Sequence, residues 1–393
     1  MATIEVADVF RQFGPSYLDA HDDRMLPSHR RAIWDITACR TQAMGGHVYQ
    51  CNDCGEHFHV YHGCRNRACP ACHTHQIEQW FEARTAELLP CPYYHVTVTV
   101  PAQLRDMMRA NQTDGYGLLM KAAAESVKAL CRDKRYMGAT PAILAVLHTW
   151  TAQMDYHPHV HMLVSGGGIE DDGITWREAK HPFLVPVRAL SKLMRGKFHA
   201  LLKKRHPGLE VQVPEQAWRT DWVAWCRHWG RGKTAVLQYL GRYVHRIAIT
   251  NQRIVAMDKR TVAFRYKNRK SNSWHICTIP GHEFMRRFLQ HVLPKGLHKV
   301  RYYGLWHCAK RAWQQKARLA LGGAHSADTQ EDPSNMQASL LLDQQGAEHG
   351  DADMASTGPT CPHCGSCATH YLGVLSRSNG VSVSARASPS SSS

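Results

Sequence analysis

The pattern of apolar and polar residues predicts three strands in the first half of the chain. They cover residues 95–100, 143–150 and 159–164. A turn near residues 154–158 would join the second and third strands into an antiparallel hairpin. Because side chains alternate between the two faces of a strand, His159 and His161 project from one face while Val160 projects into the core.

Helical spacing of apolar residues predicts helices around these strands. The expected helices cover the N-terminal segment to about residue 38 and residues 116–133, 186–205 and 283–291, and two more strands are expected at 247–254 and 261–266. The sequence therefore predicts an α+β fold in which a central antiparallel sheet is flanked by helices.

The charge of the chain indicates a polyanionic partner. The 48 Lys and Arg residues exceed the 32 Asp and Glu residues, which gives a formal net charge of +16. Residues 322–360 contain seven acidic residues and no Lys or Arg, so the rest of the chain carries 48 basic against 25 acidic residues. Such an excess is typical of proteins that bind nucleic-acid phosphates. No apolar run approaches the ~20 residues of a membrane-spanning helix, and we expect a cytoplasmic protein with no membrane partner.

The fourteen cysteines indicate metal binding in a reducing compartment, because several stand in Cys-x-x-Cys pairs and the N-terminus does not resemble a secretory signal. Cys51 with Cys54 and Cys69 with Cys72 are two such pairs, with fourteen residues between them. We expect these four thiolates to bind one structural Zn²⁺.

Further cysteines are left over on both sides of this set. A second zinc site could be built from Cys39, His47 and Cys64. Near the C-terminus, the Cys-x-x-Cys pair at 361–364, with Cys367, could be half of another zinc site or a rubredoxin-like knuckle. Its fourth ligand could be His363 or His370.

His159 and His161 are candidate ligands of a catalytic metal. Two imidazoles on one face of a strand can hold a divalent ion and leave coordination positions open for a phosphate oxygen. In the expected hairpin His148 lies almost opposite these histidines, and it is the first candidate for a third ligand. Gln153 and Asp155 are the alternatives.

Tyr239 and Tyr243 are candidate nucleophiles. On a helix, residues four positions apart emerge on the same face, and a tyrosine hydroxyl that attacks a phosphate leaves a covalent protein–DNA intermediate. A cation held by the histidines would polarise that phosphate. Residues 230–234 resemble the end of a nucleotide-binding P-loop, but Arg227 stands where the first glycine would fall, which argues against ATP binding.

The motifs and their order resemble those of one protein family. His-hydrophobic-His followed by Tyr-x-x-x-Tyr is similar to the HUH endonucleases, and specifically to the two-tyrosine rolling-circle transposases of bacterial insertion sequences, the IS ninety-one group. The resemblance covers roughly residues 5–310, and it includes the segments 95–101, 147–150, 166–168, 239–251, 283–288 and 291–296. The cysteine-rich start of the chain resembles the zinc-binding module of the same family. The chain departs from the family at residues 151–153, where a glycine usually precedes the glutamine.

The resemblance implies a transposase that cleaves and rejoins single-stranded DNA at insertion-sequence ends. It implies Mg²⁺ or Mn²⁺ at His159, His161 and the third ligand, with attack by Tyr239 or Tyr243. The products would be a 5′-phosphotyrosine and a 3′-OH that primes replacement synthesis. The partners would be the element ends, the target DNA, and host replication and helicase proteins. Basic residues that could bind DNA phosphates are Arg242, Arg246, Arg286 and Arg287.

Two other classes of protein would share part of this chemistry. A plasmid rolling-circle replication initiator or relaxase-type nickase would use the same site without the cysteine module, and a catalytically dead copy would only bind DNA. The expected domains are a helical segment (1–38), a zinc-binding domain (39–90), an HUH catalytic domain (91–320), a flexible acidic linker (321–360), a zinc knuckle (361–375) and a disordered tail (376–393).

Overall fold

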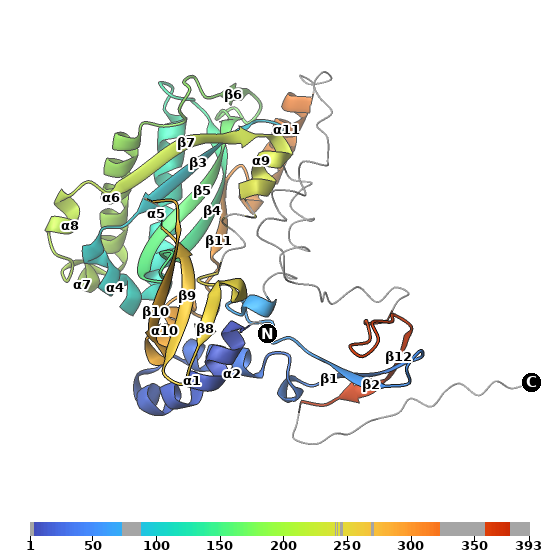
Figure 1. The fold of residues 1–393 in the computed structure, drawn as a ribbon. Helices are drawn as coiled ribbons and strands as arrows, with labels where there is room; N and C mark the ends of the chain where they lie inside the picture. Colours follow the sequence, from blue (N-terminus) through green and yellow to red (C-terminus); the bar gives the residue numbers. More distant parts are fainter. Residues whose placement is uncertain are drawn as a thin grey trace, which may run out of the picture. The chain divides into compact units, whose positions relative to one another are not determined.

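The chain forms two compact units (Figure 1). The computed structural model describes residues 4–72, 88–239, 241, 243, 247–268, 271–322 and 358–377. Unit 1 contains residues 4–72, 249–292 and 358–377, and unit 2 contains residues 88–248 and 293–322. Both units combine antiparallel sheets with helices, which confirms the predicted α+β class. Arg242, Arg246 and most of the expected linker and tail lie outside the described residues.

A six-stranded antiparallel sheet forms the centre of unit 2. Its strand order is β11-β4-β5-β3-β7, and the short β6 pairs with β5. The strands are β3 (Pro92–Thr99), β4 (Thr140–Trp150), β5 (Tyr156–Ile169), β6 (Trp176–Glu178), β7 (Val223–Arg231) and β11 (Val300–Gly304). β4 and β5 form the predicted hairpin, and their turn is closed by a backbone bond of 3.0 Å from Thr151 to Asp155.

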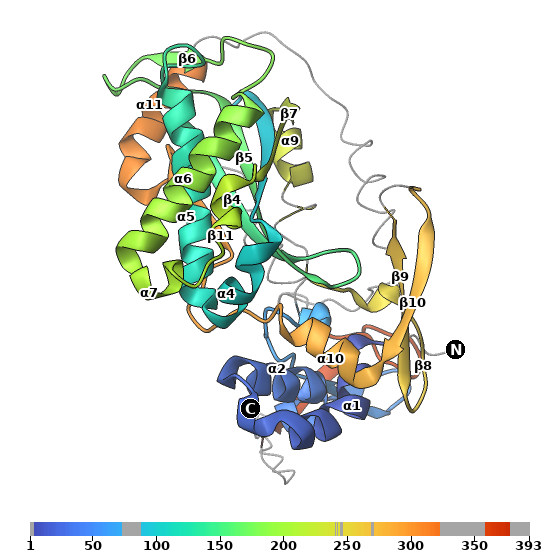
Figure 2. The ribbon, with the colours of Figure 1, turned by 90° about the vertical axis from the view of Figure 1, so that its left-hand side faces the viewer.

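One face of this sheet packs on two long helices, α5 (Gln112–Arg132) and α6 (Val187–Arg205). Figure 2 shows the two helices side by side over the sheet. They confirm the helices predicted at 116–133 and 186–205. Val160 belongs to the core on this face, as its place in the strand pattern predicted. Short helices η3 (Ala102–Leu104), α4 (Arg105–Ala110), α7 (Pro207–Glu210) and α8 (Gln216–Arg219) complete this side.

The opposite face of the sheet carries α9 (Gly232–Tyr239), η6 (Cys308–Lys310) and α11 (Arg311–Gly322). Its apolar core includes Leu144, Val146, Leu163 and Tyr239. Alternation along β4 and β5 places the three candidate histidines on this face, beside that core. The sheet therefore separates a large, mainly apolar core from a face that mixes apolar residues with buried imidazoles.

Unit 1 contains helices and two three-stranded antiparallel sheets, β12-β1-β2 and β10-β9-β8. The strands are β1 (Gly46–Cys51), β2 (His57–Tyr61), β8 (Ile254–Met257), β9 (Thr261–Lys267), β10 (Trp274–Pro280) and β12 (Thr369–Leu375). The helices are α1 (Val6–His21), η1 (Asp22–Arg24), α2 (Pro27–Ala38), η2 (Gln42–Met44), η5 (Asn251–Arg253) and α10 (Gly281–Leu289). α1 packs on α10, with the rings of Phe10 and Phe288 4.9 Å apart.

The structure divides the chain differently from the domains that the sequence suggested. Residues 249–292, expected within the catalytic domain, belong to unit 1, and so do the described residues of the C-terminal knuckle. The strand expected at 247–254 begins only at Ile254, while β9 and α10 confirm the elements expected at 261–266 and 283–291.

Candidate active site and cysteine clusters

Three buried histidines from β4 and β5 gather on the α9 face of the central sheet. His148 lies directly opposite His159 in the strand pairing, and His161 is two residues further along β5. Each can bring one nitrogen within 4.8 Å of the others, a spacing that fits a divalent ion held by three imidazoles. Of the alternative ligands, Asp155 accepts a hydrogen bond of 3.0 Å from Thr151 within the turn, and Gln153 lies in the same turn.

A fourth histidine, His95 on β3, contacts this triad. Its Nε2 lies 2.9 Å from Nδ1 of His161, and the hydroxyl of Thr97 lies 3.1 Å from the same Nδ1. Nδ1 of His159 is engaged in the same way, 2.6 Å from the backbone oxygen of His157. Hydrogen bonds of this kind fix the ring orientation of metal-binding histidines and leave Nε2 as the ligand atom. The sequence-based site did not include His95, because the pairing of β3 with β5 is not visible in a local pattern.

Tyr243 lies beside the histidines. Its ring centroid is 4.2 Å from that of His161 and 4.5 Å from that of His95. Its backbone oxygen accepts a hydrogen bond of 2.6 Å from Nε2 of His148. The side chain is half-buried. The structure therefore brings one of the two predicted nucleophiles to the predicted metal ligands.

Tyr239 has a different environment from Tyr243, although their rings are only 5.0 Å apart. It ends α9, is fully buried, and its hydroxyl has no hydrogen-bond partner among the residues that the structure describes. Burial raises the pKa of Tyr239 well above its ordinary value. The two tyrosines lie close together, although α9 ends at Tyr239 and does not include Tyr243, and their environments are not equivalent.

The edge strand β7 adds aromatic and cationic side chains to the same region. The guanidinium of Arg227 lies over the rings of Trp225 and Trp229, 4.8 and 5.4 Å from their centroids. Both indole rings lie 5.2 Å from the ring of His95. Trp225 is 40% exposed, so a planar group from solvent can reach it. No sequence motif singled out the two tryptophans, and Arg227 was noted only for its place in the P-loop-like segment. The strand that brings the three side chains to one face was not predicted.

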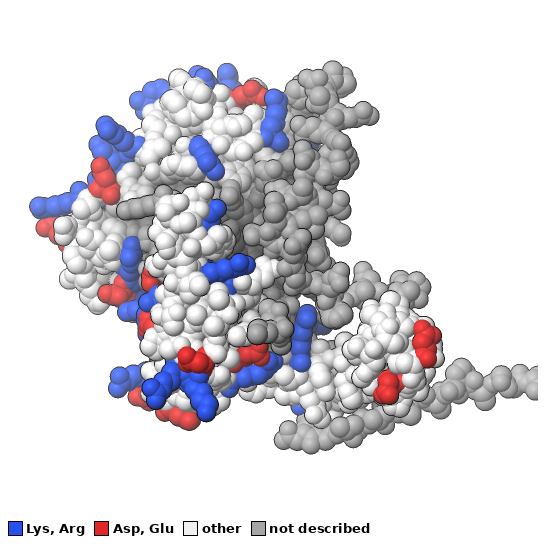
Figure 3. Space-filling view, in the orientation of Figure 1, with Lys and Arg blue, Asp and Glu red and all other residues white. Residues whose placement is uncertain are grey.

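The remaining basic candidates are less directly placed. Arg286 and Arg287 lie on α10 in unit 1, and both pair with Glu283, at 2.6 and 2.8 Å. The hydrogen bonds from Arg286, followed by those from Arg287, lower the pKa of Glu283 to about 2. On the face shown in Figure 3, Lys and Arg lie at many separate places with Asp and Glu among them. DNA binding by Arg286 and Arg287 remains a prediction.

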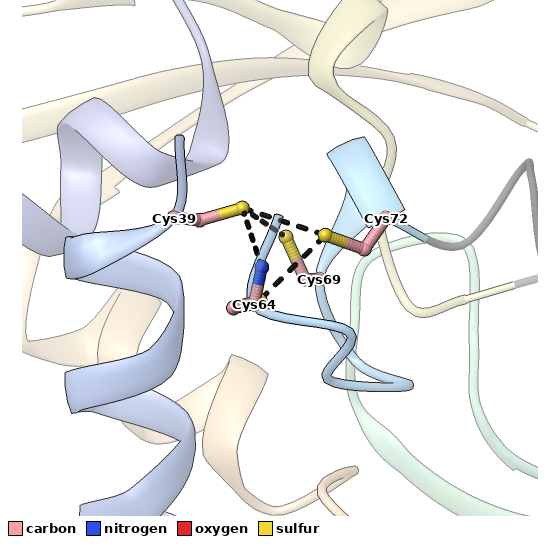
Figure 4. A group of neighbouring side chains, drawn as sticks. All are labelled: Cys39, Cys64, Cys69 and Cys72. Atoms are coloured by element: carbon pink, nitrogen blue, oxygen red, sulfur yellow. Dashed lines mark hydrogen bonds between the residues drawn. The ribbon is translucent and has the colours of Figure 1, made fainter. Parts of the chain in front are cut away.

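Four cysteines of unit 1, Cys39, Cys64, Cys69 and Cys72, point toward one another (Figure 4). The sulfur of Cys72 lies 3.4 Å from that of Cys39 and 3.7 Å from that of Cys64, and Cys69 lies 3.7 Å from Cys39. A tetrahedral zinc with Zn–S bonds of ~2.3 Å separates its sulfurs by about 3.8 Å, so the cluster fits this ion. Hydrogen bonding, chiefly with Cys39, lowers the pKa of Cys72 and favours its thiolate.

Cys51 and Cys54 belong to a different group, with Cys361 and Cys364. The predicted zinc site of Cys51, Cys54, Cys69 and Cys72 is therefore wrong, because the hairpin of β1 and β2 separates its two halves. Cys51 and Cys54 stand at the turn, whereas Cys64, Cys69 and Cys72 follow β2, whose five residues span about 16 Å.

The smaller zinc predictions are corrected in the same way. The expected second set shares Cys39 and Cys64 with the cluster of Figure 4, but His47 lies outside it, its ring 4.8 Å from that of His62. The C-terminal half-site is completed by the pair at 51–54, and neither His363 nor His370 belongs to the group. Nδ1 of His370 instead lies 2.6 Å from the side-chain oxygen of Asn52.

Comparison with known proteins gives two family matches. A family model described as "Putative transposase" matches residues 142–313, and one described as "Transposase zinc-binding domain" matches residues 9–100. "Putative transposase y4qJ" of Sinorhizobium fredii is 39% identical over 317 residues, which cover 76% of this chain and 79% of that protein. "Transposase for insertion sequence element IS801" of Pseudomonas savastanoi pv. phaseolicola is 25% identical over 286 residues, 69% of this chain and 68% of its own.

Two negative findings accompany these matches. No solved structure matches the chain. Among the described residues, none of the helices has the length and apolar character needed to cross a membrane.

Proposed function

Since the chain belongs to the family of insertion-sequence transposases of the IS ninety-one and IS801 type, we propose that it cleaves and rejoins single-stranded DNA during rolling-circle transposition. A transposase acts on DNA, and the N-terminal module of this family binds zinc. The observation that carries the proposal is the position of Tyr243 against three buried histidines on one face of the sheet.

The histidine triad would hold Mg²⁺ or Mn²⁺, and the bound ion would polarise the scissile phosphate. The hydroxyl of Tyr243 then attacks phosphorus, and the P–O3′ bond breaks. The phenol gives up its proton and the leaving 3′ oxygen takes one up, so the products are a 5′-phosphotyrosine and a 3′-OH. The 3′-OH can prime replacement synthesis, and the phosphotyrosine ester keeps the strand available for rejoining.

We assign the first attack to Tyr243 and a second transesterification to Tyr239. Tyr243 is half-buried and touches His161, whereas Tyr239 is fully buried and lies behind it. The partial exposure of Tyr243 favours this side chain over Tyr239 for the first contact with a phosphate. Tyr239 has to leave its buried position before it can react, so we expect it to attack after Tyr243.

The edge strand β7 would hold the unpaired DNA next to the nucleophile. Trp225 offers an exposed ring on which a base can stack, and Arg227 offers a guanidinium for the backbone phosphate. Stacking of this kind requires bases that are not paired in a duplex, which accounts for a preference for single strands. Arg227 stands where a P-loop would have its first glycine, which argues against ATP binding by this segment. We therefore expect host replication and helicase proteins to separate the DNA strands.

The test is a cleavage assay with the zinc-loaded full chain and labelled single-stranded DNA that carries an element end. Covalent adducts formed with Mn²⁺ would be resolved on a denaturing gel and mapped by mass spectrometry. We expect an adduct on Tyr243 that is lost with EDTA and with His159→Ala. Tyr243→Phe should abolish it, while Tyr239→Phe should retain the first cut and lose the second transfer.

The two tyrosine variants serve as matched controls, since each removes one hydroxyl from the same side of the sheet. An adduct on Tyr239 in the wild type, with Tyr243→Phe still active, would reverse the order of attack. DNA binding without any adduct on either tyrosine would mean that this copy binds element ends without cutting them.

A further inference from the structure

Two five-residue segments from opposite ends of the chain have the same sequence pattern and the same backbone conformation. They are residues 51–55 and 361–365, both of the form Cys-x-x-Cys-Gly. Gly55 and Gly365 adopt φ values of 75° and 77°, in the left-handed region that favours glycine. A Cβ at either glycine would meet no atom within 4 Å, so the conformation and not lack of space requires glycine.

The hydrogen bonds of the two segments also match. Gly55 donates to the carbonyl of Cys51 at 3.0 Å, and Gly365 donates to the carbonyl of Cys361 at 2.9 Å. The backbone nitrogen of each first cysteine donates to the residue five positions on, at 3.0 Å for Cys51 and 2.8 Å for Cys361. Residues 51–55 and 361–365 are therefore two copies of one tight turn, which we call the paired knuckles.

The paired knuckles bring their four sulfurs together. The sulfur of Cys51 lies 3.5 Å from that of Cys364, and the sulfur of Cys54 lies 3.7 Å from that of Cys361. These separations are close to the ~3.8 Å of a tetrahedral zinc thiolate site and far from the ~2.05 Å of a disulfide.

Antiparallel pairing of β12 with β1 holds the C-terminal knuckle next to the N-terminal one. It pairs along the whole of β1, from Gly46 opposite Leu375 to Cys51 opposite Thr369. Just beyond the strand, the backbone nitrogen of Asn52 donates to the oxygen of Ala368 at 2.8 Å. The buried apolar cluster of this sheet is small and consists of Phe58 and two cysteines, Cys51 and Cys361. Sheets with so little apolar core need a metal or another cross-link for stability.

We propose that Cys51, Cys54, Cys361 and Cys364 bind a second structural Zn²⁺, separate from the one at Cys39, and that this ion fastens residues 358–377 to the N-terminal module. Half of its ligands lie beyond both matched family regions, which end at residues 100 and 313. The site is independent of the nuclease chemistry proposed above.

The first test is the zinc content of the full chain, measured by native mass spectrometry and by elemental analysis. We expect two Zn²⁺ per chain in the wild type and loss of one in Cys361→Ser/Cys364→Ser. Cys367→Ser is the matched control, because Cys367 follows the same knuckle but lies outside the group. It should keep both ions. One ion in the wild type, or two in the double variant, would overturn the proposal.

A second test needs no variant and so does not depend on how the double variant folds. Cys54 and Cys364 are exposed, and so are Cys308 and Cys367. In the zinc-loaded wild type we expect Cys54 and Cys364 to resist alkylation while Cys308 and Cys367 react, because a metal-bound thiolate is a poor nucleophile and burial cannot protect exposed groups. Removal of zinc should make all four react. Equal reactivity of the four cysteines before chelation would refute the site.

Discussion

Replacement of His95 should weaken metal binding at the histidine triad without touching a ligand. His95 and Thr97 each contact Nδ1 of His161, at 2.9 and 3.1 Å, and they lie 3.2 Å from each other. Loss of such a partner typically costs 10–100-fold in metal affinity, or about 1.4–2.8 kcal/mol. Because Thr97 remains in His95→Phe, we expect the affinity of this variant for the metal to fall about tenfold. In His95→Phe/Thr97→Val, which loses both contacts, we expect the affinity to fall about a hundredfold.

The assay is calorimetric titration of the zinc-loaded full chain with Mn²⁺ in the absence of DNA. His95→Gln should recover part of the affinity, because its amide can reach the position of Nε2. Tyr93→Phe is the matched control. Tyr93 lies on the same strand and face as His95, and the change removes two buried hydrogen bonds between its hydroxyl and the backbone of Leu89, away from the three histidines. If the double variant bound Mn²⁺ within about twofold of the wild-type affinity, with an unchanged circular dichroism spectrum, His95 and Thr97 would have no role in orienting His161.

Three further predictions concern separate parts of the chain. Tyr239→Phe removes a buried hydroxyl that has no hydrogen-bond partner among the described residues. We therefore expect the free energy of unfolding to stay unchanged or to rise by up to about 1 kcal/mol. A clearly lower melting temperature would contradict this expectation. Trp225→Ala should weaken binding of single-stranded DNA, measured by fluorescence anisotropy, by about 1–3 kcal/mol. Trp274 is also an exposed tryptophan with an arginine, Arg265, over its ring, and Trp274→Ala should have little effect on binding. Equal losses of affinity in the two variants would disprove a specific role for β7. The pKa of Glu283 is lowered to about 2 by Arg286 and then Arg287, so its ion pairs stabilise the fold above pH ~4.5 and are lost as the pH falls toward 2. We expect Glu283→Gln to lower the free energy of unfolding by roughly 1–2 kcal/mol at pH 7 and by little near pH 2, as measured by chemical unfolding. An equal loss at both pH values would argue against a stabilising role of these ion pairs.

Local periodicity was sufficient to place the histidines. Alternation along β4 and β5 indicated which side chains share a face, and the short turn between the strands limited their register, so His148 could be placed almost opposite His159 or His161. The structure pairs it with His159. His95 could not be found in this way. It reaches His161 through the pairing of β3 with β5, between strands far apart in the sequence, and no local pattern encodes that neighbourhood.

The cysteines show the limit of spacing as a guide. Sequence proximity grouped Cys51 with Cys69, but the β1–β2 hairpin separates them, and the correct partner of Cys51 is more than 300 residues away. The useful signal was the glycine that follows Cys54 and Cys364 but not Cys72, because it marks the same turn at both ends of the chain. Strands β7 and β10 were missed because both are edge strands in which charged or polar residues stand among exposed aromatic and aliphatic ones.

The pairing of β1 with β12 also affects how the protein is made. Cys54 and Cys361 are 307 positions apart, so at 5–20 residues per second a ribosome needs roughly 15–60 s to make the second knuckle after the first. During this time Cys51 and Cys54 form an open half-site, and only a chain translated past Cys364 can close it. A gene copy cut short at its 3′ end would therefore encode the central sheet of unit 2 intact but never complete the sheet in which β12 pairs with β1.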